Sequence, residues 1–378
     1  MENNIKKLIS FRHNLHRHPE LSGNEKATAS AILHYLADTT PEEKYTKIGG
    51  YGIVLVFDSG NPGPVTLIRG DMDALPIDEP PLVPYHSLQA GISHKCGHDG
   101  HTAILAGLAE RLTQAPLKKG KAILVFQPAE ETGTGAQAML QGNFPAHLSP
   151  DIVFAFHNIP GKEKHRIILR DGFFASASRG IVIHLSGKTA HAAEPEKGIN
   201  PAFAIAEMIP ALSQLPEKMK SQGYAAKITL IHLKVGEIAF GTSPGEGVLM
   251  ATLRTRSDEA MTQLCTATEM LVKAIAAKHL LTLSINYTEI FPATTSHPQA
   301  NTKVEKAAKS LSLSIEKNND TFDWSEDFGH FTKRWPGCMF GIGAGTEQAN
   351  LHNNTYDFPD EIIPTAIALF EKLIKNSG

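Results

Sequence analysis

The chain has 378 residues, of which 42% are hydrophobic and 20% charged, with a formal net charge of -3. This length exceeds what one hydrophobic core usually supports, so we expect two domains. The small net charge gives no basis for nucleic-acid or membrane-surface binding, and no run approaches the roughly 20 apolar residues of a membrane span. The N-terminal segment predicts an amphipathic helix rather than a signal peptide, and the three scattered cysteines favour a reducing compartment. We therefore expect a cytoplasmic protein.

The first part of the chain alternates helix-like and strand-like patterns. Apolar residues three or four positions apart predict two N-terminal helices, and short continuous apolar runs predict strands covered on both faces. These runs begin at Gly52, Val65, Ala122 and Asp151. A helix over about 102–112 lies between two of them, and a further strand and an amphipathic helix end the chain. This order predicts an α/β domain with a central mixed sheet and helices on both faces.

The middle of the chain predicts a different fold. Strand-like and helix-like segments follow one another in the order βαββαβ, which is the ferredoxin-like α+β arrangement. They cover 181–186, 200–212, 228–233, 248–254, 258–278 and 281–287. We therefore expect an inserted domain over 178–290, within an α/β domain formed by 1–177 and 291–378.

The segment from Cys96 to His101 combines a thiol with two imidazoles just before a predicted helix. A turn at Gly97 would let Cys96 and His98 converge, and both side chains are good ligands for zinc-like metals. The alternative is a polar helix start in which Asp99 only caps the helix.

Three further segments follow strand-like runs. Glu130 and Glu131 are adjacent carboxylates that suit one metal ligand and one general base, although a solvated loop would look the same. His157 follows a buried strand, and His352 follows a glycine-rich run; each alone is as easily a core or loop histidine. Because strand ends of an α/β sheet meet at one crevice, the combination predicts a metal site.

Two more polar groups are candidates for supporting roles. Asp71 or Asp73, at the end of a strand, could orient a ligand histidine, since metal-bound imidazoles usually donate their other N–H to a carboxylate; a structural turn is the alternative. His191 follows a strand of the inserted domain and could stabilise a substrate oxyanion.

The chain resembles the N-acyl-amino-acid amidohydrolases nearly throughout its length. This group includes hippurate hydrolases, auxin-conjugate hydrolases and N-acetyldiaminopimelate deacetylases, within the aminoacylase/carboxypeptidase family of di-metal exopeptidases. The matching segments are 15–21, 71–76, 96–101, 126–131, 190–192 and 351–352.

The resemblance implies a zinc-exopeptidase-type fold with two divalent metal ions, zinc or manganese, with cobalt and nickel as further options. The metal ligands it implies are Cys96, His98, Glu131, His157 and His352. Glu130 would be the general base that activates the attacking water and later protonates the leaving amine. Asp73 would support a metal-site residue.

The same resemblance implies that the substrate is a small N-acyl-amino acid, cleaved to a carboxylic acid and a free amino acid. His191, Asn200 and Arg254 would contact this substrate. The inserted domain would act as a lid and as the dimerisation surface of a homodimer. No nucleic-acid or membrane partner is expected.

Some features depart from the family pattern, and other functions are open. The loop before Arg254 lacks the usual Asn-Val-Ile-Pro element, and Lys95 and the segment 82–84 are individual to this chain, which bears on specificity. Within the family, an N-acetyldiaminopimelate-type deacetylase, a dipeptidase or a carboxypeptidase is an alternative. Outside it, Cys96 could be the nucleophile of a cysteine hydrolase, or the chain could bind a metal or ligand without catalysis.

Overall fold

The computed structural model describes residues 2–375, and their side chains from residue 4 onward. The chain forms two compact units. The first comprises Met1–Phe174, Thr294–Thr321 and Glu326–Gly378, and the second comprises Ala175–Ala293 with Phe322–Ser325. The short segment Phe322–Ser325, expected in the first domain, instead belongs to the second unit, where the backbone oxygen of Phe322 accepts a hydrogen bond from the Ser176 N–H.

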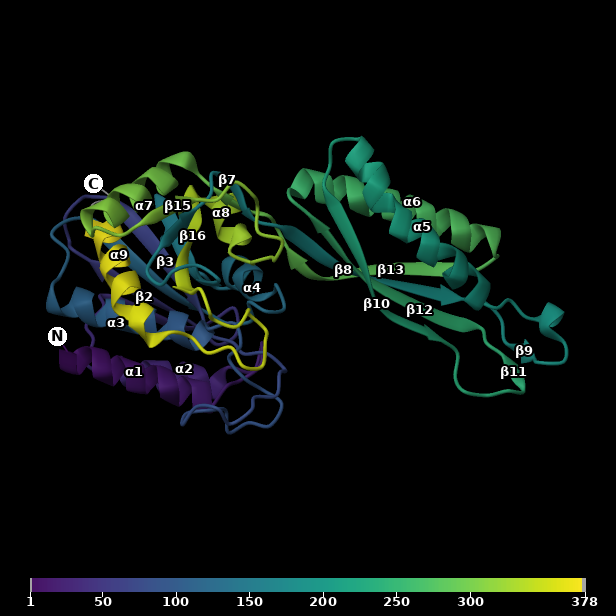
Figure 1. Cartoon of the computed structure of the whole chain (residues 1–378), viewed down its shortest axis with the longest axis horizontal. Coiled ribbons are helices and arrows are strands. Elements are labelled where there is room, and N and C mark those ends of the chain that lie inside the picture. The colour runs from purple at the N-terminus through teal and green to yellow at the C-terminus, as the bar shows by residue number, and fades with distance from the viewer. Residues whose placement is uncertain (1, 376–378) are drawn as a thin grey trace. The chain divides into compact units, whose positions relative to one another are not determined.

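An eight-stranded mixed sheet forms the centre of the first unit (Figure 1). Its four middle strands run parallel to one another, while β1, β2 and β6 add antiparallel pairs. The spatial order is β1 (Glu43–Ile48), β2 (Gly52–Asp58), β4 (Lys121–Gln127), β3 (Val65–Asp71), β5 (Ile152–Pro160), β16 (Gly337–Gly345), β6 (Ile167–Leu169) and β15 (Ile315–Lys317). Side chains of the central strands are buried on both faces, as their continuous apolar sequences predict.

Helices cover this sheet. On one face, the apolar stripes of five helices and the sheet share a single core. These are α1 (Glu2–Arg17), α2 (Lys26–Tyr35), α3 (His98–Gln114), α7 (Pro298–Ser310) and α9 (Ile363–Lys375). The shorter helices α4 (Gly135–Gln141) and α8 (Gly329–Arg334) contact each other and the strands β4 and β16, respectively. The remaining elements are the paired strands β7 (Gly172–Ala175) and β14 (Thr294–Ser296) and the 3-10 helix η2 (Asp360–Ile362).

The second unit has the βαββαβ order. Its four-stranded antiparallel sheet is arranged β10-β12-β8-β13, with both helices packed in one core with it. The elements are β8 (Ala177–Ser186), α5 (Ala202–Ser221), β10 (Ala226–Val235), β12 (Glu246–Thr255), α6 (Asp258–Lys278) and β13 (Thr282–Phe291). A small ribbon of β9 (Ala190–His191) and β11 (Thr242–Ser243), and the 3-10 helix η1 (Pro195–Lys197), complete it. The predicted fold class, an α/β sheet with a ferredoxin-like insertion, is confirmed.

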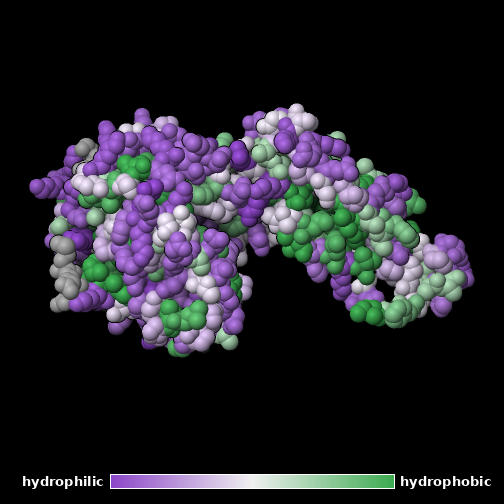
Figure 2. Space-filling view, viewed as in Figure 1, coloured by the Kyte–Doolittle hydropathy of each residue, from purple (hydrophilic) through white to green (hydrophobic). Residues whose placement is uncertain are grey.

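Exposed apolar side chains gather on the second unit, where Figure 2 shows green surface. Ile231 and Leu233 of β10 are exposed, and Ile238 and Phe240 in the following loop are almost fully so, at 98% and 99%. Among the described residues, no helix is both long and apolar enough to cross a membrane.

Candidate metal centre

Four neighbouring parallel strands of the first unit bring chemically active residues to one edge of the sheet. The strands β4, β3, β5 and β16 lie side by side and run in the same direction, so their carboxyl ends meet. Asp73 follows β3 and Glu130 follows β4. His157 lies near the carboxyl end of β5, and His352 follows β16. The expectation that His157 follows this strand is wrong in this detail, because β5 includes His157 and continues to Pro160.

The turn at Gly97 sets the positions of Cys96 and His98. Gly97 has a φ of 91°, in the left-handed region, and α3 begins at His98 rather than at the predicted residue 102. A Cβ atom on Gly97 would lie 2.9 Å from the Phe358 ring, so the turn requires glycine. Asp99 does not cap the helix: it lies within the first turn and forms ion pairs with Arg12, at 3.0 Å, and His16, at 2.8 Å.

The structure brings the five predicted ligand residues together in two overlapping groups. In each group the possible ligand atoms all lie within 4.8 Å of one another. The groups are Cys96, His98 and His157, and Cys96, Glu131 and His352. The Cys96 Sγ atom is 3.5 Å from His157 Nε2, and a Glu131 carboxylate oxygen is 3.7 Å from His352 Nε2. A thiolate, three imidazoles and a carboxylate form a donor set that suits zinc-like ions.

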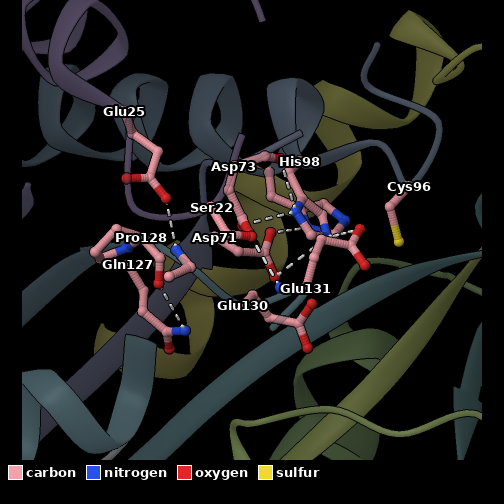
Figure 3. A network of polar contacts seen from close by, with 12 residues as sticks. Ser22, Glu25, Asp71, Asp73, Cys96, His98, Gln127, Pro128, Glu130 and Glu131 are labelled. Carbon is pink, nitrogen blue, oxygen red and sulfur yellow. Dashed lines mark hydrogen bonds and ion pairs between the residues drawn. The ribbon is translucent and has the colours of Figure 1, made fainter. Parts of the chain in front are cut away.

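Hydrogen bonds on Nδ1 direct the Nε2 atoms of two histidines toward this cluster. His98 Nδ1 donates to Asp73, whose backbone oxygen is 3.1 Å away, and His157 Nδ1 donates to the Asn158 backbone oxygen at 3.0 Å. Asp73 also accepts from the Ser22 hydroxyl and the Glu131 N–H (Figure 3). Among the described residues, buried His98 Nε2 and Glu131 Oε1 have no hydrogen-bond partner, which fits atoms facing a cation.

The pKa values of the candidate ligands are strongly shifted by burial and by one another's charges. Burial raises the pKa of Glu131 to about 8, and burial with the nearby carboxylates raises the pKa of the Cys96 thiol well above its usual range. Burial lowers the pKa of His98, but the charge of Asp71 and the hydrogen bond to Asp73 outweigh it and raise the pKa to about 10. Without a cation, protons stay on the Glu131 carboxyl, the Cys96 thiol and the His98 imidazolium; a bound divalent ion would displace them.

Glu130 stands beside the ligand cluster, and its carboxylate lies within 4.8 Å of candidate ligand atoms on His98 and Glu131. Burial, followed by the charge of Glu326, raises its pKa well above the ordinary value. The preceding residue, Ala129, has a φ of 52°, and its N–H is held by the buried Glu25 carboxylate at 2.8 Å. This bend redirects the chain after β4, and it gives Glu130 and Glu131 different surroundings.

His101, in the segment from Cys96 to His101, contacts residues around the candidate ligands, a position for which the sequence predicted no role. His101 bridges the Asp71 carboxylate and the side-chain oxygen of Asn158. Asn158 in turn donates to the Cys96 backbone oxygen at 3.1 Å. Asp71 therefore supports His101, whereas Asp73 supports His98. The repeated histidine and the paired aspartates were visible signals, but only their placement in space distinguishes them.

The three predicted substrate-contacting residues belong to the second unit, and the structure gives their contacts within it. His191 is exposed on β9, with Nδ1 accepting from the Ala193 N–H at 3.0 Å. The Asn200 side-chain oxygen accepts from the Ala202 N–H at 2.9 Å. Arg254 donates to the Asp323 backbone oxygen and to the Ser325 hydroxyl, at 2.9 and 2.8 Å.

Comparison with known proteins identifies the family. The sequence pattern of peptidase family M20/M25/M40 matches residues 67–376. A hippurate hydrolase of Campylobacter jejuni is 30% identical over 365 residues, covering 96% of this chain and 94% of the relative. An N-acetyldiaminopimelate deacetylase of Priestia megaterium is 29% identical, with 98% of both chains covered.

Solved structures agree. The Bacillus subtilis YXEP protein, a dinuclear metal binding peptidase from the M20 family, is similar with a TM-score of 0.82 and 26% identity, covering 100% of this chain and 99% of its own. A putative aminohydrolase from methicillin-resistant Staphylococcus aureus has a TM-score of 0.89 and 25% identity, with 100% and 97% covered. The resemblance and the prediction of an enzyme are confirmed. The chain therefore belongs to peptidase family M20/M25/M40 and is a metallohydrolase of the amidohydrolase and peptidase class.

Proposed function

We propose that this enzyme cleaves the amide bond of N-acyl-amino acids, releasing a carboxylic acid and a free amino acid. The observation that carries the proposal is the position of Glu130, a buried carboxylate directly beside a cluster of candidate metal ligands. The hippurate hydrolase relative, whose whole length the chain nearly covers, supports this substrate class. The N-acetyldiaminopimelate deacetylase relative, at nearly the same identity, supports a deacetylase of that type as a second candidate.

Five residues would hold two divalent ions, and they fit such ions because of their donor types and the unpartnered ligand atoms of His98 and Glu131. They are Cys96, His98, Glu131, His157 and His352. The ions would be zinc or manganese, with cobalt or nickel as alternatives, and when bound they supply Lewis-acid polarisation of the amide carbonyl and acidify water. The dinuclear character of the YXEP relative supports the number two.

Glu130 would carry the proton through the reaction. As a carboxylate it takes a proton from the attacking water, and burial then favours its neutral, protonated form. Protonated Glu130 can deliver this proton to the nitrogen of the leaving amine, whose departure breaks the amide bond. Buried Glu326 and Asp327 lie beside it, and the Asp327 N–H donates to one Glu130 oxygen at 3.3 Å, which orients the carboxylate.

Residues of the inserted unit would bind the substrate. We assign His191 to the oxyanion that forms on the substrate carbonyl, and Asn200 and Arg254 to its polar groups. We further propose a homodimer that associates through the inserted unit, because exposed Ile231, Ile238 and Phe240 leave an apolar surface there. The unpaired cysteines support a reducing cytoplasm as its location.

A nucleophilic role for Cys96 is disfavoured by its surroundings. Burial and the charges of Glu131 and Glu130 raise the pKa of its thiol, whereas a cysteine nucleophile needs a lowered pKa. The same thiol becomes a thiolate readily when it binds a metal ion, so a ligand role is the better assignment.

The substitution Glu130→Gln tests the proposal. With hippurate and other benzoyl-, acetyl- and indole-acetyl-amino acids as substrates, we expect kcat to fall at least about 100-fold while the metal content and KM stay unchanged. Glu163→Gln, at an exposed carboxylate paired with Arg166, is the matched control and should keep full activity. Near-normal turnover by Glu130→Gln at full metal occupancy would refute the assignment of the base.

A further inference from the structure

Lys95, the residue directly before Cys96, is buried. Its side chain is 1% exposed, and its ammonium group donates to the Glu79 carboxylate and, at 2.8 Å, to the backbone oxygen of Tyr356. Its backbone oxygen accepts a hydrogen bond from the N–H of His352, also at 2.8 Å. One residue thus holds both ends of the turn from His352 to Tyr356, and it immediately precedes Cys96.

This turn depends on such contacts for its conformation. His352 has a φ of 64°, an unfavourable value for a residue with a Cβ atom, and its side chain is 53% exposed. Packing alone therefore does not fix the imidazole. A second link runs through the buried Asn158, which donates to the Tyr356 hydroxyl at 2.6 Å and to the Cys96 backbone oxygen. These contacts set the register between the turn and the Cys96 loop.

Glu79, the carboxylate that pairs with Lys95, is itself held by further hydrogen bonds. Glu79 accepts hydrogen bonds from His16 at 3.1 Å and from the Ser87 N–H at 2.7 Å, in addition to the one from Lys95. These partners outweigh the effect of burial and lower the pKa of Glu79 to about 2, so it is a carboxylate that balances the Lys95 charge. His16 pairs in turn with Asp99 in the first turn of α3.

His98 and His157 are supported differently. Their Nδ1 atoms bond to Asp73 and to the Asn158 backbone oxygen, and neither bond involves Lys95. Of the candidate ligands, only His352 is hydrogen-bonded to Lys95 among the contacts described here. A change of the Lys95 side chain leaves the backbone hydrogen bond to His352 in place but removes the ammonium contact to the Tyr356 backbone oxygen at the other end of the His352 turn. We therefore expect it to act on the ligand group that contains His352.

We propose that Lys95 is a positioning residue that clamps the His352 turn to the Cys96 loop and so sets the affinity for the ion shared by Cys96, Glu131 and His352. The ion held by Cys96, His98 and His157 does not depend on it. This inference rests on the proposed two-ion centre. It accounts for a lysine that is buried directly before a candidate metal ligand.

The test is the binding of Co²⁺ alone to the metal-free full chain, measured by equilibrium dialysis and by visible absorption. For Lys95→Met we expect two binding steps. The step for the ion held by Cys96, His98 and His157 should be unchanged. The step for the ion that includes His352 should lose about 10–100-fold in affinity, the usual effect of removing an outer partner of a ligand. Lys162→Met, which removes an ammonium group paired with Glu316 on the surface, should leave both steps unchanged. Equal weakening of both steps, or no weakening, would overturn the proposal.

A double-mutant cycle with His352→Ala separates positioning from general damage. If Lys95 acts through His352, Lys95→Met adds no further loss of Co²⁺ affinity in the His352→Ala background, whereas a merely structural effect adds to it. If His352→Ala itself leaves both steps intact, the proposed metal centre is wrong; if only Lys95→Met is silent, the clamp alone is wrong. Should Lys95→Met not fold because Glu79 is left unbalanced, Lys95→Met combined with Glu79→Gln is measured by the same criteria.

Discussion

The Nδ1 atom of His98 lies 3.1 Å from the backbone oxygen of Asp73 and 3.3 Å from one of its carboxylate oxygens. This pairing fixes the imidazole so that Nε2 faces Glu131, at 3.8 Å from its carboxylate. The other carboxylate oxygen of Asp73 accepts the Glu131 N–H at 3.0 Å. One buried aspartate thus orients two proposed ligands that lie far apart in the sequence.

The substitution Asp73→Ala should weaken metal binding by about 10–100-fold, because it removes the carboxylate oxygen beside His98 Nδ1 and the acceptor of the Glu131 N–H, although the backbone oxygen that also accepts from His98 remains. Calorimetric titration of the metal-free protein with Zn²⁺ measures this directly. Asp58→Ala, at a surface pair with Lys121, serves as the control and should bind normally. Unchanged Zn²⁺ affinity in Asp73→Ala would show that the pairing has no bearing on the ligands.

The substitution Gly97→Ala should lower the free energy of unfolding by about 2–4 kcal/mol, from a left-handed backbone and crowding against Phe358. Gly60→Ala is the matched control, because Gly60 has a φ of 71° but open space around its Cβ position, and it should lose only about 1–2 kcal/mol. Urea unfolding gives both values. Equal losses would mean that the close approach of Phe358 is unimportant.

His16 should make stability depend on pH. Burial lowers the pKa of His16, but the charge and hydrogen bond of Asp99, with help from Glu79, outweigh it and raise the pKa to about 9. Because the unfolded value is about 6.5, protonated His16 stabilises the fold fully below about pH 6.5 and loses this effect as pH rises through about 9.

The substitution His16→Gln should therefore cost about 2–3 kcal/mol at pH 6 and progressively less toward pH 10. Denaturant unfolding across this range, with His147→Gln at an exposed pair with Glu43 as control, measures the difference. A cost that stays constant with pH, or that grows as pH rises, would contradict the assigned ion pairs.

Much of the fold was predictable because local signals agreed with the final packing. The helix expected over 258–278 is α6, whose Ser257 caps the first turn by accepting the Ala260 N–H. Helix α5 was predicted to end at residue 212 but continues to Ser221 through Pro210 and Pro216. Proline disfavours such a continuation, yet burial of Leu215 and Met219 outweighs this preference.

Some elements at the periphery of the first unit could not be predicted from the sequence. The strand β1, Glu43–Ile48, has a polar sequence and was not predicted, because it pairs with β2 through its backbone at the edge of the sheet and buries little. Likewise α7 was not predicted, because three of its buried side chains are small alanines, Ala300, Ala307 and Ala308, which give a weak apolar pattern. Such elements depend on partners that no local pattern reveals.

The candidate ligands were recognisable in the sequence, but the contacts that hold them in the structure were not. Cys96, His98 and Glu131 are identifiable as candidate ligands by type and by position after strands. That Asp73 supports His98 while Asp71 supports His101 follows only from the folded arrangement. The proposed role of Lys95 likewise could not be predicted, because it depends on a contact with Tyr356, which is far from Lys95 in the sequence.

The central claim is that hydrolysis requires two divalent ions at this cluster. The most direct measurement removes metal with a chelator, then adds Zn²⁺, Mn²⁺ or Co²⁺ stepwise while hippurate hydrolysis and bound metal are followed together. We expect no hydrolysis by the metal-free chain and full recovery only as binding reaches two ions per chain. Hydrolysis that persists without metal, or full hydrolysis while the chain holds only one ion, would contradict the account.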